Sequence, residues 1–153
     1  MDLEYGPEYQ DFTKKVQSFC KKYKGLSFKD QANTPLISSG GSGGPEIHRS
    51  EWQKILIENG YFARSVPKEY GGYGGEADII KSRIIAAEFS KSKTPTPMGG
   101  QGIDMLVPTL LEMGTEEQKQ AYIKPTLHGE MIWCQGYSEP NAGSDLASLQ
   151  TKG

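Results

Sequence analysis

Glycine divides this chain into segments, because eleven of its 19 glycines fall in three short clusters. The clusters lie within residues 40–44, 71–75 and 99–102. Glycine reaches backbone conformations that other residues avoid and is unfavourable inside helices and strands, so each cluster predicts a loop or a tight turn. A chain of 153 residues is long enough to bury one hydrophobic core. We therefore expect one domain's worth of ordered segments joined by glycine-rich connections.

The segments between the clusters carry helical periodicity. Residues 8–24 place apolar side chains three or four positions apart, with lysines on the other face and Gly25 at the end. The same reasoning predicts four further helices, over residues 46–60, 76–92, 101–113 and 115–124. Residues 26–46 show no period and contain a Ser/Gly-rich run, which predicts a flexible loop. The expected fold class is therefore mainly α.

Individual residues predict where two of these helices begin and pack. Ser50 and Gln53 have the spacing of a capping box, although Pro45 and Glu46 indicate an earlier start. The expected core face of the next helix consists of Ile80, Ile84 and Ala87.

The last two predicted helices are separated by Gly114. Residues 101–113 are mostly apolar, so this helix is expected to be the most buried, with a kink or a restart at Pro108. Residues 115–118 (TEEQ) form a capping box that opens the following helix. Because a proline disfavours a helical residue before it, Pro125 is expected to end that helix near Lys124.

The chain changes character after Gly129. Residues 131–137 are short, apolar and aromatic and are bounded by turn residues, which predicts a buried strand. Cys134 and Trp133 within it are expected to pack in the core, as is Trp52. A lone strand has an unpaired edge, so the last twenty or so residues are expected to be disordered or paired with another chain.

Composition excludes several classes of function. The chain has 17 Lys and Arg against 19 Asp and Glu, a balance that argues against nucleic-acid binding. It contains no apolar run long enough to span a membrane. Cys20 and Cys134 indicate reduced thiols in a cytoplasmic protein. His48 and His128 have no partner at ligand spacing, so surface or helix-capping roles are expected and no metal site is indicated.

The most informative stretch is residues 138–145 (SEPNAGSD), which follow the predicted strand. Ser138 and Ser144 carry hydroxyl groups that can donate to phosphate or carbonyl oxygens, and Gly143 allows close approach of the backbone to a ligand. Glu139 and Asp145 have no histidine between them, so a hydrolytic pair is not supported. From the residues alone, both a ligand-binding loop and an ordinary surface turn remain open.

This stretch resembles the signature of the acyl-CoA dehydrogenases, FAD-dependent enzymes that oxidise the α,β bond of acyl-CoA thioesters. Three more segments are similar to this family in the same order along the chain: residues 67–72 (PKEYGG), 114–119 (GTEEQK) and 133–137 (WCQGY). The resemblance runs from about Trp52 to the end. It implies a helical N-terminal domain over residues 1–129, and the first strand of a truncated middle β-domain over 130–153.

The resemblance also implies a cofactor site. Six residues are expected to bind FAD: Gln135, Gly136, Tyr137, Ser138, Gly143 and Ser144. By this resemblance Tyr137 and Ser138 would lie against the isoalloxazine ring, and Ser144 would lie near the pyrophosphate and the acyl-CoA substrate. Asn141 stands where many relatives have glycine.

The family's catalytic glutamate belongs to its C-terminal domain, so no catalytic residue is expected in this chain. We expect the N-terminal part of an acyl-CoA dehydrogenase that is colourless and inactive when purified alone. The missing groups would come from a homo-oligomer or from a companion chain that carries the other domains. The alternative is a non-catalytic helical assembly module, or a partner subunit of a split flavoprotein.

Overall fold

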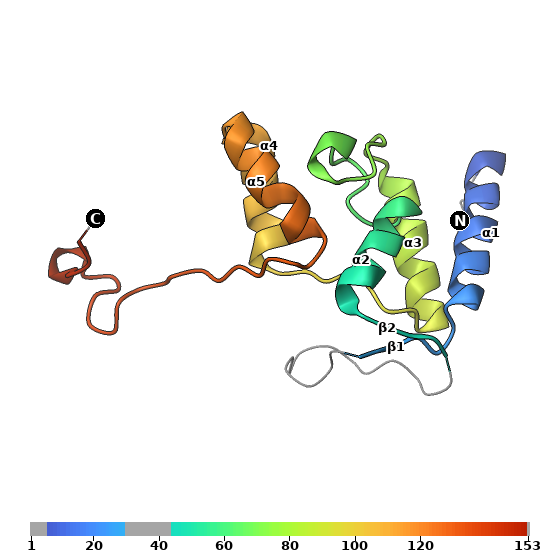
Figure 1. The fold of residues 1–153 in the computed structure, drawn as a ribbon, viewed down its shortest axis with the longest axis horizontal. Coiled ribbons are helices and arrows are strands. Elements are labelled where there is room, and N and C mark those ends of the chain that lie inside the picture. The colour runs from blue at the N-terminus through green and yellow to red at the C-terminus, as the bar shows by residue number, and fades with distance from the viewer. Residues whose placement is uncertain (1–5, 30–43, 153) are drawn as a thin grey trace, which may run out of the picture.

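The periodic N-terminal segment forms α1 (Pro7–Lys22), with Pro7 in its first turn, where its missing N–H costs nothing. The structure, a computed structural model, describes residues 6–29 and 44–152. Val16, Phe19 and Cys20 of α1 are buried, and the helix packs mainly against α3 (Ile79–Ser92) (Figure 1). The N-terminal helix prediction is therefore confirmed.

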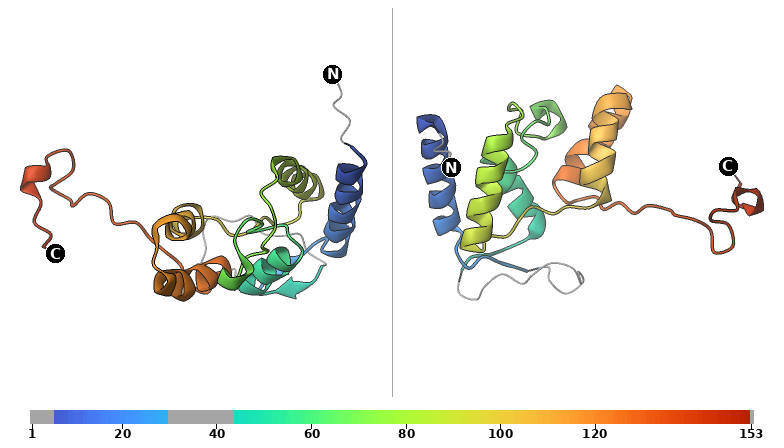
Figure 2. Two further views of the ribbon diagram at one scale, coloured as in Figure 1. Left: turned by 90° about the horizontal axis from the view of Figure 1, so that it is seen from above. Right: turned by 180° about the vertical axis from the view of Figure 1, so that it is seen from behind.

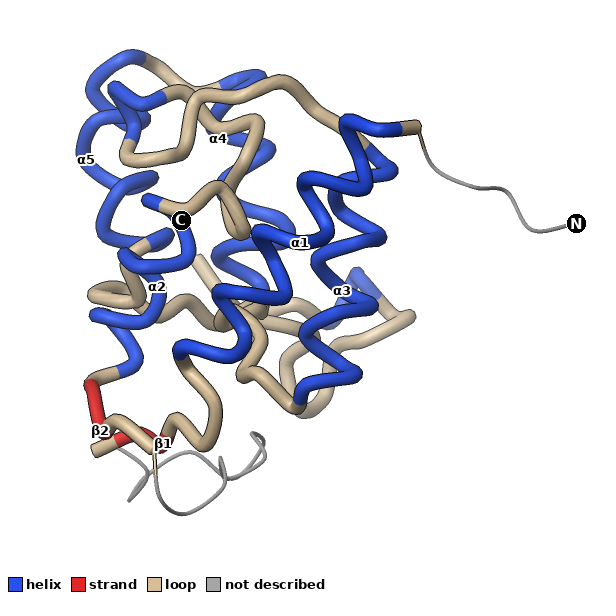
Figure 3. The backbone as a smooth tube through the Cα atoms, turned by 90° about the vertical axis from the view of Figure 1, so that its right-hand side faces the viewer, coloured by secondary structure: helices blue, strands red, loops and turns tan. Residues whose placement is uncertain are grey.

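The remaining elements are mostly helical, which confirms the expected fold class (Figure 3). They are β1 (Ser27–Phe28), β2 (Glu46–Ile47), α2 (Arg49–Glu58), the 3₁₀ turn η2 (Lys68–Tyr70), the π-helical turn η3 (Gly102–Leu106), α4 (Val107–Met113), α5 (Glu116–Leu127) and the 3₁₀ turn η4 (Leu146–Ser148). Helices α1, α2 and α3 form one group and α4 pairs with α5 beside it (Figures 1 and 2). Residues 130–152, the C-terminal arm, run away from this helical body.

Two hydrophobic clusters hold the body together. The first surrounds Trp52 and includes Phe19 and Phe89, whose rings stack 6.0 Å apart. The second lies between α2, η2, α4 and α5; its buried residues are Ile57, Val66, Tyr70, Val107, Leu110, Ile123 and Leu127. α2 contributes to both clusters, so it is the helix that joins the two groups.

The predicted loop over residues 26–46 is ordered at both ends. Ser27 and Phe28 of β1 pair in parallel with Glu46 and Ile47 of β2, and residues 30–43 between them lie outside the described part. Because Glu46 is engaged in this pairing, the helix begins only at Arg49. The early helix start was therefore wrong.

The capping box predicted from Ser50 also does not form, since His48 is the N-cap of α2. Gln53, its expected partner, is instead fully buried. The capping box of α5 is confirmed: Thr115 and Gln118 exchange side chain-to-backbone hydrogen bonds.

Helix α3 begins three residues later than the pattern indicated. The Asp78 side chain accepts a hydrogen bond from the Lys81 backbone N–H at 2.9 Å, which caps the helix there. Ile84 faces the core as expected, but Ala87 is exposed and Phe89 takes the inward position. The larger ring buries more apolar surface than a methyl group, which fixes the rotation of the helix.

The apolar segment 101–113 restarts as predicted, since the π-helical turn η3 gives way to α4 just before Pro108. It is not the most buried helix, because Met105 and Met113 are 51% and 78% exposed. Helix α5 runs past Lys124 with Pro125 inside it. The proline removes a single backbone donor, and the buried side chains of Thr126 and Leu127 retain the last turn.

The strand predicted over residues 131–137 does not form within the described part of the chain. The segment is extended but has no strand beside it, and a strand is stable only when its backbone groups are paired. Cys134 is consequently exposed, contrary to expectation, whereas Cys20 is buried.

Tyr70 of η2 gives a prediction about high pH. Its Oη donates to Glu116 Oε2 at 2.8 Å, which joins the PKEYGG turn to the first turn of α5. This hydrogen bond, followed by burial, raises the pKa of Tyr70 to about 12 from 10.0. The folded state therefore holds this proton more tightly than the unfolded state. We therefore expect the contribution of the Tyr70 hydrogen bond to the free energy of unfolding to be lost as the pH rises from about 10 towards 12.

Urea unfolding of the wild type and of Tyr70→Phe across this alkaline range tests the prediction. Since phenylalanine has no proton to lose, the stability difference between the two proteins should narrow as the pH rises. A difference that stays constant would contradict the assignment.

Candidate functional site

Residues 138–145, which resemble the acyl-CoA dehydrogenase signature and are called the resembling stretch below, form a compact turn at the end of the arm. Glu139 and Ala142 form an isolated antiparallel bridge, with the Ala142 N–H donating to the Glu139 carbonyl oxygen at 3.2 Å. Ser148 Oγ lies 3.0 Å from the carbonyl oxygens of both Asn141 and Asp145. The turn therefore holds its shape through its own hydrogen bonds.

Glu139 has a structural role in this turn. Its carboxylate accepts hydrogen bonds from the Thr151 hydroxyl group and from the backbone N–H groups of Gln150 and Thr151, the first of these N–H bonds being 3.0 Å long. These bonds, that of the Thr151 hydroxyl first, lower the pKa of Glu139. A carboxylate held in its charged form by three donors is poorly suited to act as a general base.

The six residues expected to bind FAD lie along one exposed stretch. Gln135, Gly136, Tyr137, Ser138, Gly143 and Ser144 are all exposed. The structure brings Ser138 and Gly143 together: a Cβ added to Gly143 would lie 3.6 Å from Ser138 Oγ. Tyr137 Oη accepts a hydrogen bond from Gln101 Nε2 at 3.1 Å, which connects the arm to the helical body.

A pocket of about 120 Å³ lies where the arm leaves the helical body, and we call it the arm-root pocket. Its lining residues are Met98, Gly99, Gly100, Gln101, Gly102, Ile103, Thr126, Gly129, Met131, Ile132 and Trp133. One wall is the segment 98–103, and the other combines the end of α5 with the start of the arm. The sequence predicts only a loop or a turn at the glycine cluster 99–102, and nothing in it connects this cluster to the arm.

Gly102 makes this pocket possible. A Cβ added there would lie 2.5 Å from Trp133 Cδ1, which is too close for any residue larger than glycine. Trp133 Nε1 also donates to Thr126 Oγ1 at 2.8 Å, and its ring meets that of Tyr122 edge-on at 5.6 Å. Trp133 therefore packs against the helical body, but it is only half-buried and does not lie in the core as predicted.

Gly102→Ala is expected to displace the Trp133 indole and break its hydrogen bond to Thr126, because the added methyl group occupies the ring's place. The change should appear as a red shift in tryptophan emission. Gly99→Ala is the matched control, since its added Cβ would make only an ordinary contact, 3.6 Å from Asp104 Oδ2. An unshifted spectrum for the Gly102 variant would disprove the close packing.

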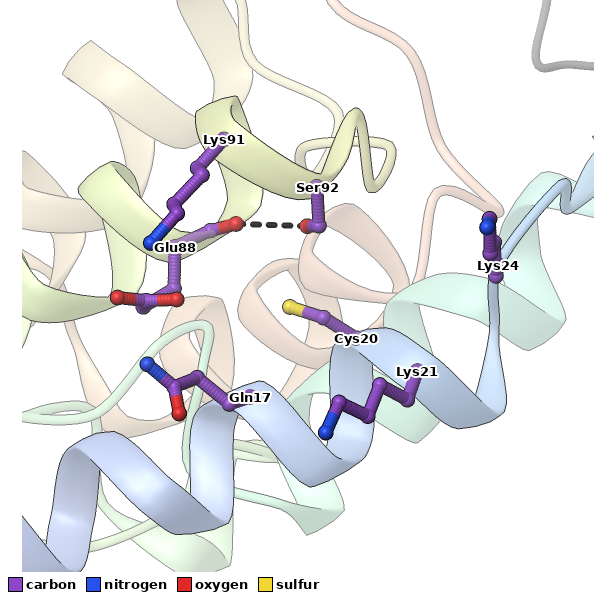
Figure 4. A pocket seen from close by; sticks show the side chains of 7 residues that line it. All are labelled: Gln17, Cys20, Lys21, Lys24, Glu88, Lys91 and Ser92. Atoms are coloured by element: carbon purple, nitrogen blue, oxygen red, sulfur yellow. Dashed lines mark hydrogen bonds between the residues drawn. The ribbon is translucent and has the colours of Figure 1, made fainter.

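A separate hollow of about 490 Å³ lies between α1 and α3. Its lining residues are Gln17, Cys20, Lys21, Lys24, Glu88, Lys91 and Ser92 (Figure 4). Ser92 Oγ is already bonded to the Glu88 carbonyl oxygen at 2.6 Å. The hollow contains no residue of the resembling stretch, and surface lysines alone do not define a ligand site.

The side chains that could ligate a metal are spread over the described ranges. Among residues 6–29 and 44–152, no group of three or more His, Cys, Asp or Glu could hold a metal ion. His48 is the N-cap residue of α2 but makes no side-chain capping hydrogen bond, and His128 is the C-cap residue of α5. Burial, followed by the charge of Lys54, lowers the pKa of His128. None of the described helices is long and apolar enough to cross a membrane.

The described part of the chain is a helical body that is followed by an exposed arm. The family model "Acyl-CoA dehydrogenase, N-terminal domain" matches residues 27–130. This chain belongs to the acyl-CoA dehydrogenase family.

Individual relatives agree with this assignment. Acyl-CoA dehydrogenase IpdE1 of Mycolicibacterium smegmatis is 37% identical over 103 residues, which cover 67% of this chain and 26% of the relative. The short-chain specific acyl-CoA dehydrogenase of Clostridium acetobutylicum is 44% identical over 109 residues, which cover 69% of this chain and 28% of the relative. Acyl-CoA dehydrogenase FadE26 of Mycobacterium tuberculosis is 29% identical over 151 residues, which cover 99% and 36%.

A solved structure shares the fold as well. The ChsE4-ChsE5 complex from Mycobacterium tuberculosis superposes with a TM-score of 0.57 at 27% identity, over 99% of this chain and 35% of the matched chain. The chain thus spans between 26% and 36% of the length of the relatives named here.

Proposed function

We propose that this chain forms the N-terminal part of an FAD-dependent acyl-CoA dehydrogenase, which oxidises the α,β C–C bond of an acyl-CoA to give the enoyl-CoA. The observation that carries the proposal is the resembling stretch 138–145, which lies on an exposed arm directly after the family-matched helical body. The similarity to FadE26 extends over nearly the whole chain and supports the same relation between body and arm.

The residues of the arm fit a flavin. A Cβ added to Gly136 would have nothing within 4 Å, and only Ser138 lies that close to Gly143, so the backbone here is open to a ligand. The exposed hydroxyl groups of Ser138 and Ser144 can donate hydrogen bonds to ring or phosphate oxygens. Gln135 and Tyr137 complete the proposed set, and Ser144 would also contact acyl-CoA.

FAD would supply the acceptor for the hydride that leaves the β-carbon of the substrate. Hydrogen bonds from the Ser138 hydroxyl group and neighbouring N–H groups would stabilise negative charge on the reduced ring. The proposed division places the helical domain at residues 1–129 and the start of a β-domain at 130–153. Companion polypeptide, from the same protein or from a partner chain, would supply the catalytic base and the remaining flavin contacts.

The test is to produce this chain together with polypeptide carrying the missing domains of the family and to measure bound flavin. We expect a yellow complex that reduces a dye when acyl-CoA is added. Ser138→Ala should weaken flavin retention about tenfold, the usual effect of one lost hydrogen bond to a partly charged group. Ser90→Ala, at an exposed position on α3, is the matched control and should retain flavin like the wild type.

The same experiment addresses the alternative of a non-catalytic assembly module. A stable complex that never binds flavin would favour that alternative and overturn the proposed function. Equal flavin loss in the Ser138 and Ser90 variants would mean that the arm is not part of the cofactor site.

A further inference from the structure

Gln53 is a polar side chain in the interior of the helical body. It is 0% exposed and lies in α2 beside Trp52. Its Nε2 donates to the Leu127 carbonyl oxygen at 3.0 Å, and its Oε1 accepts from the Met98 N–H at 2.8 Å. A buried amide is tolerated when its groups are bonded in this way, so Gln53 connects three segments far apart in the sequence.

Each of the two hydrogen-bond partners of Gln53 lies at a different wall of the arm-root pocket. Met98 begins the wall formed by residues 98–103, and Leu127 lies between the lining residues Thr126 and Gly129 of the other wall. The Leu127 carbonyl is one of the last four of α5, which have no partner within the helix. Gln53 therefore satisfies a helix end and holds the opposite wall at the same time.

The packing around these bonds leaves little freedom. Gly129 has φ +69, and a Cβ added to it would lie 2.9 Å from Met98 Sδ and 3.7 Å from Gln53 Cγ. Trp52 Nε1 donates to the Pro95 carbonyl oxygen at 3.1 Å, which fixes the segment leading to Met98. The hydrogen bonds of Trp52 and Gln53, both in α2, therefore fix the separation of the two walls.

The walls in turn hold the arm. Gly102 packs against Trp133, and Gln101 donates to Tyr137 Oη, one residue before the resembling stretch. We propose that Gln53 is a positioning residue that fixes the width of the arm-root pocket and, through it, the place of the arm. Its relevance to flavin and acyl-CoA rests on the proposed function, but its effect on the arm does not.

The indole N–H signals of the chain test this proposal, because the sequence contains 2 tryptophans. In a ¹⁵N-labelled sample, Gln53→Met should shift the Trp133 signal and speed its hydrogen exchange about tenfold, as expected when a buried hydrogen bond is lost. Gln120→Met makes the same change on the exposed face of α5 and should leave Trp133 unaffected. A folded Gln53→Met protein with an unchanged Trp133 signal would overturn the proposal.

The variant Gln53→Glu provides a second test of the proposal if the methionine variant does not fold. A protonated glutamic acid can accept from Met98 and donate to Leu127, as the amide does, but a carboxylate cannot donate. Burial raises the pKa of such a carboxyl group, so the Trp133 signal should be native at low pH and altered once the group ionises. A Trp133 signal that ignores this titration would also overturn the proposal.

In the flavin-loaded protein, the same variants separate the two proposals. Displacement of Trp133 with full flavin retention would leave Gln53 as a positioning residue and count against the proposed cofactor site. A native Trp133 signal would overturn the inference whatever happens to flavin.

Discussion

Replacing Trp52 with alanine is expected to lower the free energy of unfolding by about 3–5 kcal/mol, among the largest effects of any single truncation in this chain. Trp52 is 1% exposed, stacks on Phe19 at 5.6 Å and meets Tyr23 edge-on at 5.0 Å. The truncation leaves a cavity in the first hydrophobic cluster and removes the donor to the Pro95 carbonyl oxygen. Both effects destabilise the folded state.

Denaturant unfolding monitored by circular dichroism measures this loss. Trp133→Ala is the matched control, because the same side chain is removed from a half-buried position on the arm. We expect a clearly smaller loss there, since the indole contacts mainly Tyr122, Thr126 and Gly102. Equal losses in the two variants would mean that Trp52 does not centre the core. Trp52→Phe should recover part of the stability, since it lacks the hydrogen bond and its smaller ring leaves part of the cavity unfilled.

Gly72→Ala is expected to cost about 3 kcal/mol, towards the upper end for overpacking. A Cβ at this position would lie 2.2 Å from the Val66 carbonyl oxygen and 2.4 Å from Val66 Cβ. The obstacle is mainly backbone, which cannot turn aside as a flexible side chain can. The loop is also fixed by hydrogen bonds from the Gly72 N–H to Pro67 and from the Gly74 N–H to Val66, at 3.1 and 2.8 Å.

Gly136→Ala is the control for this prediction, since its added methyl group would meet nothing within 4 Å. Its stability should stay within about 0.5 kcal/mol of the wild type. Thermal unfolding of both variants compares them directly. If the Gly72 variant is as stable as the Gly136 variant, the PKEYGG turn does not have the close backbone contact described here.

Most helices could be predicted because their signals are local. The spacing of Val16, Phe19 and Cys20 defines one face of α1, and Thr115 with Gln118 caps α5 through residues three apart. The errors arose where distant contacts outweighed local preference. Glu46 pairs with a strand nineteen positions earlier, and the last turn of α5 persists beyond Lys124 because Leu127 is buried by α2 and α4 neighbours.

The candidate site divides in the same way. The stretch 138–145 could be recognised from sequence, because it is contiguous and each residue type has its own chemistry. The arm-root pocket could not be recognised, since the contact of Gly102 with Trp133 and the bonds of Gln53 to Met98 and Leu127 join residues far apart in the sequence. Gln53 in particular has an ordinary capping-box spacing to Ser50, which concealed its buried position.

By itself, then, the sequence determined the helical class, the family and the resembling stretch, since each depends on residues within a few positions of one another. Tertiary structure decided the start of α2, the length of α5, the exposure of Cys134 and the bridge that Gln53 makes between two walls. The physical reason is that helix periodicity and caps act over one or two turns. The pairing of strands, the burial of an amide and the close approach of Trp133 to Gly102 depend on which distant segments pack together.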